Sequence, residues 1–312
     1  MGLTKPDAQR VEATNEAPPA IERASSADLA FLAMDTGKIP QQIAVILILD
    51  RLGDLSLSQL RQIISVRLRT LPRLRQRLMT VPPGCGRPVW VDDPDFDIDR
   101  HIREVPCRAP GDERALLDTA LSVVMEPLPR HAPLWSMVLI TELADGAAAV
   151  VVVLHHVLAD GLGGVNVLAT LVDPGAPAAA VPFPRARPAV SSLARDAWLT
   201  RLGGVRRAAG SWRLLRRAMF AGGGLRPAPA TPCSLVQRTG PRRRLAVIRL
   251  DRTRLAAAAH RYGATTNDAV LVAVGSALHQ VLLARGELVD PVAIAVPVSG
   301  RRPRGAPSAA IS

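Results

Sequence analysis

Hydrophobic and polar positions in the first half of the chain follow two different spacings. Dense apolar runs predict buried strands, because a strand covered on both faces carries few polar residues. Apolar residues three and four positions apart predict helices, and a turn of Ala-Asp-Gly at 144–146 predicts an antiparallel hairpin. The predicted strands are 42–49, 89–91, 135–141 and 147–154, and the predicted helices are 26–32, 56–70, 112–125 and 161–172.

This mixture of elements predicts an α+β or α/β fold in two layers. Proline- and alanine-rich segments at 174–188 and just before Pro232 predict a linker and a domain boundary. Beyond the boundary, the pattern predicts strands at 245–250 and 292–298 and helices at 251–260 and 266–283. We therefore expect a flexible arm at 1–24, a first domain at 25–173, a basic linker with amphipathic helices at 174–232, and an incomplete second domain at 233–312.

The positive charge of the chain is concentrated in one segment. The formal net charge is +12, and Arg185 to Arg254 holds 17 arginines but only two acids. Within it, residues 194–220 place tryptophan and leucine among arginines at helical spacing, a pattern broken by Gly203, Gly204 and Gly210. Such a helix suits an anionic membrane surface or serves as a solvated linker, and both interpretations stay open.

Composition excludes several other classes of protein. The chain has 312 residues, is 48% hydrophobic and has a mean hydropathy of +0.17, which excludes disorder as its main state. The purest apolar run, 147–154, is too short to span a bilayer, and the first ten residues lack a secretory signal, so we expect a cytoplasmic protein. Three widely spaced cysteines predict neither disulfides nor zinc. One tyrosine and four phenylalanines provide little stacking for nucleic acid.

The segment with the clearest chemistry is His155-His156-Val157-Leu158-Ala159-Asp160-Gly161, at the predicted end of a buried strand. Neighbouring strand residues point to opposite faces, so the two histidines are poorly placed to share a metal ion. A serine hydrolase is disfavoured because the chain has no G-x-S-x-G segment. What remains is one histidine acting as a general base, with a buried structural histidine as the alternative.

The segment resembles the HHxxxDG motif of the CoA-dependent acyltransferase superfamily. Three further segments narrow the resemblance to the actinobacterial type of the wax ester synthase/diacylglycerol acyltransferase family. These are Pro133-Leu134-Trp135, Thr266-Asn267-Asp268-Ala269-Val270-Leu271 and Val296-Pro297-Val298-Ser299. The resemblance implies a chloramphenicol-acetyltransferase-like domain followed by an incomplete second domain of the same type.

The family resemblance implies a role for each matching residue. His156, with His155 beside it, would deprotonate the acceptor hydroxyl, which attacks the acyl-CoA thioester without metal or cofactor. Asp160 would orient its loop by pairing with an arginine such as Arg243 or Arg244, and Gly161 would permit the tight turn. Asn267 and Asp268 would face the substrate tunnel, although they also suit a helix cap. Pro133, Leu134 and Trp135 would support the site, with Trp135 packed in the core.

Members of the family are longer than this chain, which ends soon after Ser299, so we expect a C-terminally truncated member. Its partners would be long-chain acyl-CoA, diacylglycerol or a fatty alcohol, and an anionic membrane or lipid-droplet surface contacted through Arg185–Arg254, which would make it peripherally membrane-associated. Its product would be triacylglycerol or wax ester. The alternatives are a catalytically inactive homologue that binds lipid surfaces, and acyl transfer to an amine or a carrier-linked substrate.

Overall fold

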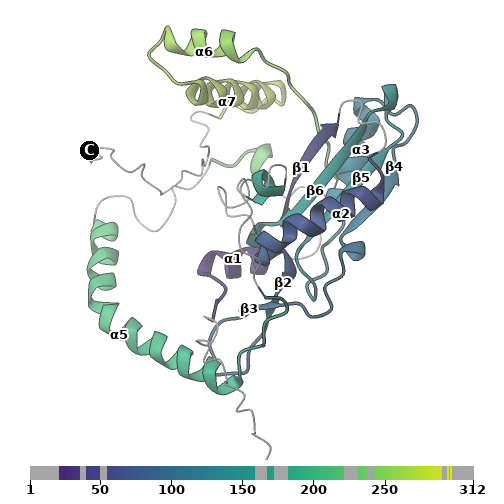
Figure 1. Cartoon of the computed structure of the whole chain (residues 1–312). Coiled ribbons are helices and arrows are strands. Elements are labelled where there is room, and N and C mark those ends of the chain that lie inside the picture. The colour runs from purple at the N-terminus through teal and green to yellow at the C-terminus, as the bar shows by residue number, and fades with distance from the viewer. Residues whose placement is uncertain are drawn as a thin grey trace, which may run out of the picture.

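The structure is a computed structural model that describes most of the chain (Figure 1). The described residues are 21–35, 40–49, 55–158, 167–171, 182–220, 231–237, 240, 242–289, 294 and 296, and within 205–220 only the side chains of Trp212 and Arg216 are described.

A four-stranded sheet forms the centre of the fold. The strand order is β1-β6-β5-β4, in which β1 and β5 run antiparallel to β6 while β4 runs parallel to β5. These strands are β1 (Gln42–Leu49), β4 (Ile102–Pro106), β5 (Trp135–Thr141) and β6 (Ala148–His155). The predicted hairpin is confirmed, because η4 (Ala144–Gly146) lies between β5 and β6. Strand β4 has no counterpart among the predicted elements, since most of its residues are not buried and its apolar spacing is weak.

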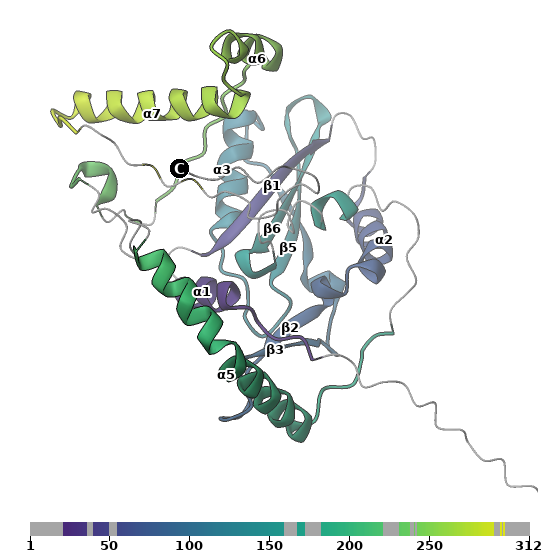
Figure 2. The same cartoon turned by 90° about the vertical axis from the view of Figure 1, so that its left-hand side faces the viewer.

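Two helices cover opposite faces of this sheet (Figures 1 and 2). Helix α2 (Leu57–Arg67) packs through Leu60 and Ile64 on the face formed by Trp135, Met137 and Leu139. Helix α3 (Glu113–Val124) packs on the face formed by Val138, Ile140, Val151 and Val153. Because successive strand residues point to opposite faces, the continuous apolar runs of β5 and β6 supply both packing surfaces. The predicted mixed α/β fold is thereby confirmed.

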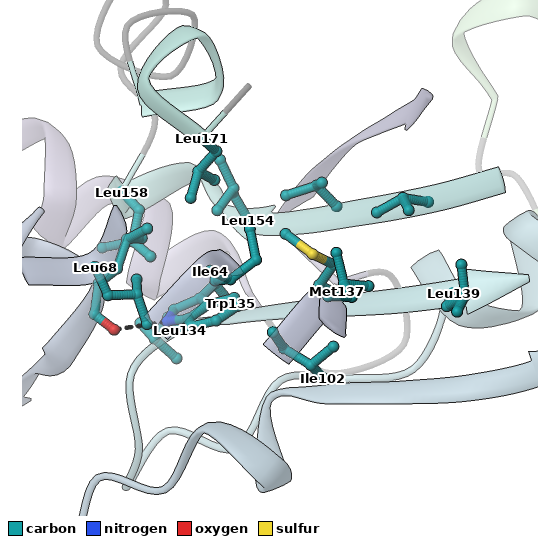
Figure 3. Close-up of a cluster of buried hydrophobic side chains, with 14 of the residues drawn as sticks. Ile64, Leu68, Ile102, Leu134, Trp135, Met137, Leu139, Leu154, Leu158 and Leu171 are labelled. Atoms are coloured by element: carbon teal, nitrogen blue, oxygen red, sulfur yellow. Dashed lines mark hydrogen bonds between the residues drawn. The ribbon is translucent and has the colours of Figure 1, made fainter. Parts of the chain in front are cut away.

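The core beneath α2 holds the largest buried side chains (Figure 3). Trp135, Met137 and Leu139 of β5 lie in a row along the sheet, with Ile102 of β4 on one side and Leu154 of β6 on the other (Figure 3). Each of these side chains is less than 3% exposed. This packing fixes β5 and β6, and therefore the position at which β6 ends.

Residues 21–24 are packed against a second, smaller sheet. Strands β2 (Gln76–Met79) and β3 (Val89–Asp92) pair antiparallel, and Arg23 forms an antiparallel bridge to Val89. Ala24 is fully buried. The predicted flexible arm at 1–24 is therefore wrong for residues 21–24, because backbone pairing and the Arg23 side chain hold this segment in place. Helix α1 (Ser26–Met34) follows directly, with Ser25 as its N-cap.

One long helix occupies the basic segment. Helix α5 (Val190–Phe220) is continuous for 31 residues, so the break predicted at its glycines is wrong. A glycine inside a helix costs only about 1 kcal/mol relative to alanine, which the remaining turns of a long helix can offset. Arg23 joins the first turns of α5 to the β2–β3 sheet, since it donates to the Asp196 carboxylate (2.6 Å) and to the Leu193 carbonyl (2.9 Å).

Two helices, α6 (Arg252–His260) and α7 (Thr266–Ala284), follow and confirm the predicted helices. Helix α7 is long and apolar enough to cross a membrane by length and composition alone, and little of it is buried. The predicted strand at 245–250 is wrong, because these residues find no partner strand in the described part of the chain and Ile248 and Leu250 are exposed. Of the predicted strand at 292–298, only Ile294 and Val296 are described, and neither is in a strand.

The remaining short elements are 3₁₀ turns. They are η1 (Leu68–Thr70), η2 (Pro72–Arg75), η3 (Ile98–Arg100), η5 (His156–Leu158) and η6 (Ser234–Val236), and residues 167–171 are helical as predicted.

Candidate active site

The two histidines lie where β6 passes into η5. His155 is the last residue of β6 and His156 is the first of η5. The His155 backbone N–H donates to the Leu134 carbonyl (3.0 Å), and the His156 backbone N–H donates to the Gln41 carbonyl (2.9 Å). Segments on both sides of β6 therefore hold the backbone of this pair, so its position depends on the whole sheet.

Both ring nitrogens of His155 contact other groups of the fold. Its side chain is 2% exposed, Nδ1 accepts from the Val157 backbone N–H (3.1 Å), and Nε2 lies 3.4 Å from the Asp35 carboxylate. These partners require the tautomer that carries its proton on Nε2. Burial lowers the pKa of His155, although the Asp35 carboxylate acts in the opposite direction. The ring is therefore neutral at neutral pH and has no free nitrogen.

His156 has a different environment. Its ring is half-buried and stacks on Phe31 of α1, with ring centroids 4.7 Å apart and planes 6° from parallel. Its Nδ1 is buried yet has no hydrogen-bond partner among the described residues. Buried polar atoms are nearly always paired in native proteins, so an unpaired one marks a position where a ligand or water is expected. Of the two histidines, His156 is the one with a ring nitrogen that the described part of the fold leaves unpaired.

The Pro133–Trp135 segment supports the histidines from the neighbouring strand. All three residues are buried, and the Leu134 carbonyl is the acceptor for the His155 N–H. The Trp135 indole N–H donates to the Leu74 carbonyl at 2.6 Å (dashed line in Figure 3). The Trp135 ring stacks on His101 at 4.6 Å. The segment therefore contacts the motif through the backbone, and Trp135 packs in the core.

The remaining residues of the motif lie outside the described part of the chain. This holds for Asp160 and Gly161, so their predicted roles stay predictions. Of the two arginines predicted as partners of Asp160, Arg243 donates through Nη1 to the carbonyls of Gly240 (2.6 Å) and Arg242 (3.0 Å).

Asn267 and Asp268 form the first turn of α7 and are both exposed. The Asp268 carboxylate accepts from the Thr265 backbone N–H (2.8 Å), while the Thr265 hydroxyl accepts from the Asp268 N–H (3.2 Å). These bonds form a reciprocal helix cap, and they lower the pKa of Asp268. Between the described residues, no hydrogen bond joins this turn to the His155–Leu158 segment. The capping interpretation is confirmed, and the tunnel-facing role stays a prediction.

The structure adds three residues that sequence patterns did not single out. Helix α1 brings Phe31 onto His156 and Asp35 onto His155, and Arg130 bonds to Asp35 in turn. Each is separated from the histidines by 25 residues or more along the chain. No local spacing in the sequence could therefore have identified them.

Comparison with known proteins gives a consistent assignment. Residues 24–270 match the sequence profile of the wax ester synthase/diacylglycerol acyltransferase catalytic domain. A Mycobacterium tuberculosis protein described as a diacylglycerol O-acyltransferase is 31% identical over 293 residues, covering 89% of this chain and 62% of its own. Another from the same organism is 33% identical over 156 residues, covering 49% and 33%. The chain thus spans between about a third and three fifths of such relatives.

Solved structures agree at the level of the fold. The wax ester synthase/diacylglycerol acyltransferase from Marinobacter aquaeolei VT8 superposes with a TM-score of 0.58 at 23% identity, covering 86% of this chain and 62% of its own. The first condensation domain of the calcium-dependent antibiotic synthetase gives a TM-score of 0.54 at 20% identity, covering 83% and 61%. Because the family profile matches most of the chain, including both histidines, this protein belongs to the wax ester synthase/diacylglycerol acyltransferase family.

Proposed function

We propose that this protein transfers a long-chain acyl group from acyl-CoA to the hydroxyl of diacylglycerol or of a long-chain alcohol, with His156 as the general base. The observation that carries the proposal is the contrast between the two histidines. Both ring nitrogens of His155 have partners in the fold, whereas Nδ1 of the half-buried His156 ring is unpaired among the described residues. Proton transfer at His156 therefore breaks no contact of the described fold.

The reaction needs only one such base. His156 takes the proton of the acceptor hydroxyl, and the alcohol oxygen attacks the thioester carbonyl of acyl-CoA. The tetrahedral intermediate collapses, the carbon–sulfur bond breaks, and the proton held by His156 passes to the leaving CoA thiolate. The balance is an ester plus free CoA, and no metal or cofactor enters the proposal.

Alcohol-dependent release of free CoA from a long-chain acyl-CoA tests this proposal. The acceptors are diacylglycerol and hexadecanol, and the variants are wild type, His156→Ala and His131→Ala. His131 is exposed and serves as a matched control. We expect His156→Ala to lower the rate by about 10²–10⁴-fold, the usual contribution of a general base, and His131→Ala to leave it unchanged. A folded His156→Ala protein with wild-type turnover would overturn the assignment of the base.

A second candidate function is binding to an anionic membrane or lipid-droplet surface, which would make the protein a cytoplasmic, peripherally membrane-associated one. The specific observation is on α5, where Trp198, Leu199, Leu202 and Trp212 are exposed among arginines. Cationic helices with exposed tryptophan and leucine lie in the headgroup region of anionic bilayers. If the protein bound lipid but transferred no acyl group, surface binding would be its function in place of catalysis.

Vesicle sedimentation separates the contributions to surface binding. We expect binding to vesicles containing phosphatidylserine, weaker binding at high salt, and little binding to purely phosphatidylcholine vesicles. Trp198→Ala tests the contribution of an exposed α5 tryptophan to vesicle binding. Trp90→Ala is unsuitable as a comparison, because Trp90 is buried in the β2–β3 sheet. Equal binding to both vesicle types at every salt concentration would contradict the proposal.

A further inference from the structure

A carboxylate and a guanidinium from distant parts of the chain meet behind the two histidines. Asp35 lies at the C-terminal end of α1, and its Oδ2 is 3.4 Å from His155 Nε2. Arg130 lies in the segment before β5, and its Nη2 is 3.2 Å from the same oxygen. The Arg130 Nη2 group also donates to the carbonyls of Asp35 (2.6 Å) and Leu32 (3.3 Å). Arg130 thus binds both the carboxylate and the C-terminal turn of α1.

We propose that Asp35 is a positioning residue for His156, acting through His155 and held in place by Arg130. The inference rests on the proposed function, because it assigns how the base of that reaction is oriented. Asp35 does not contact His156 itself, and its role is to fix which nitrogen of His155 carries the proton.

The first step in the argument concerns the tautomer of His155. A carboxylate accepts hydrogen bonds but cannot donate one, so it selects the form of His155 with a proton on Nε2. In that form Nδ1 carries a lone pair and accepts from the Val157 N–H. With the other tautomer, both the Val157 N–H and the Asp35 carboxylate would lose their partner at His155. Asp35 therefore decides whether the bond that closes the first turn after β6 is made.

The second step links that turn to His156. The bond from Val157 to His155 spans His156, so it sets the backbone from which the His156 ring projects. That ring lies on Phe31 of α1, the helix whose C-cap residue is Asp35. One helix therefore fixes the base in two ways, by stacking on its ring and by setting the turn that carries it.

The third step explains why an arginine accompanies the carboxylate. Asp35 is 14% exposed, and a nearly buried carboxylate needs a compensating charge. Arg130 provides that charge while remaining 56% exposed itself, so its own desolvation cost is small. The charged and titratable groups that face His155 are Asp35, Arg130 and His156, and among them only Asp35 attracts a proton toward Nε2.

The test uses the full chain and four variants. Asp35→Leu removes the acceptor, whereas Asp35→Asn keeps an oxygen that can accept from Nε2. Arg130→Leu removes the arginine that holds Asp35 in place. Because Arg130 is exposed, this variant should fold even if Asp35→Leu does not. Asp118→Asn is the matched control, because Asp118 is an exposed acid on α3 that also pairs with an arginine, Arg114.

Two readouts are needed. Nitrogen-15 NMR of the histidine rings reports which nitrogen of His155 is protonated, and it requires no activity. Steady-state CoA release gives kcat and KM for palmitoyl-CoA. We expect Asp35→Leu to remove the Nε2-protonated signature of His155 and to lower kcat by between about 10-fold and about 100-fold, the scale of a small misplacement of a catalytic group. KM should change less than about twofold, because the positioned group acts on the chemical step.

The other variants sharpen the result. Asp35→Asn should keep the tautomer and rescue most of kcat, Arg130→Leu should lower kcat less than Asp35→Leu, and Asp118→Asn should match wild type. A folded Asp35→Leu protein with the wild-type tautomer and kcat would overturn the inference, as would an Arg130→Leu protein indistinguishable from wild type in both readouts. If wild type itself releases no CoA, the proposed function fails, and the NMR signature still decides whether Asp35 sets the tautomer.

Discussion

Replacing Trp135 with phenylalanine tests how strongly the core holds the strand beside the histidines. Trp135 is 1% exposed, and its indole N–H is the donor to the buried Leu74 carbonyl. Phenylalanine leaves that carbonyl unpaired, which costs about 1–3 kcal/mol. The smaller ring also loses apolar contact worth about 1 kcal/mol, roughly one buried methylene group. We therefore expect the free energy of unfolding to fall by about 2–4 kcal/mol.

Urea denaturation followed by circular dichroism measures this loss as a lower midpoint with an unchanged slope. The matched control is Trp198→Phe, the same chemical change at a side chain that is 61% exposed, and it should alter stability by less than about 0.5 kcal/mol. Equal midpoints for the two variants would refute the reasoning, because burial and the hydrogen bond to Leu74 are the only grounds for expecting a difference.

Two further predictions concern pH and backbone conformation. Burial lowers the pKa of His101 and of His155, so below about pH 6.5 the unfolded chain binds more protons than the native one. The free energy of unfolding should therefore decrease as the pH is lowered, by up to about 1.4 kcal/mol per pH unit for each group. A urea midpoint at pH 5.5 as high as at pH 7.5 would contradict this. Gly111 has φ +76°, and an added Cβ would lie 2.6 Å from the Glu142 carbonyl oxygen, whereas Gly84 has φ +88° and open space around it. Gly111→Ala should therefore be less stable than Gly84→Ala by about 1–3 kcal/mol in the same assay, and similar midpoints would show that the loop adjusts freely.

The elements that were predictable from sequence are those whose signals are local. The caps at Ser56 and Asp112 and the apolar runs of β5 and β6 depend on residues within a few positions of one another. The prediction failed at 245–250, where the same kind of apolar run has no partner strand in the described structure, because a strand exists only when its backbone groups are paired.

The candidate site likewise combines features with a local sequence signal and features that depend on distant residues. His155 and His156 were recognisable as a pair, and the end of a buried strand was recognisable as their location. Which of the two has an unused ring nitrogen was not, since that depends on Asp35, which lies 120 residues away in sequence. The pairing of the Leu134 carbonyl with His155 likewise follows from the β5–β6 register, which no motif states.

The way α1 is attached has a consequence for the order in which the protein loses structure. The helix has no buried residue, and only Phe31 and Leu32 pack, partly buried, against the core. Its contacts with the site include an aromatic stack and a group of polar bonds. Segments with little buried apolar surface open locally at a lower free energy than the core they rest on. On warming, amide hydrogen exchange in residues 26–35 should therefore accelerate before exchange in β6. Catalytic competence and global folding would then be separate transitions, with the catalytic one at the lower temperature.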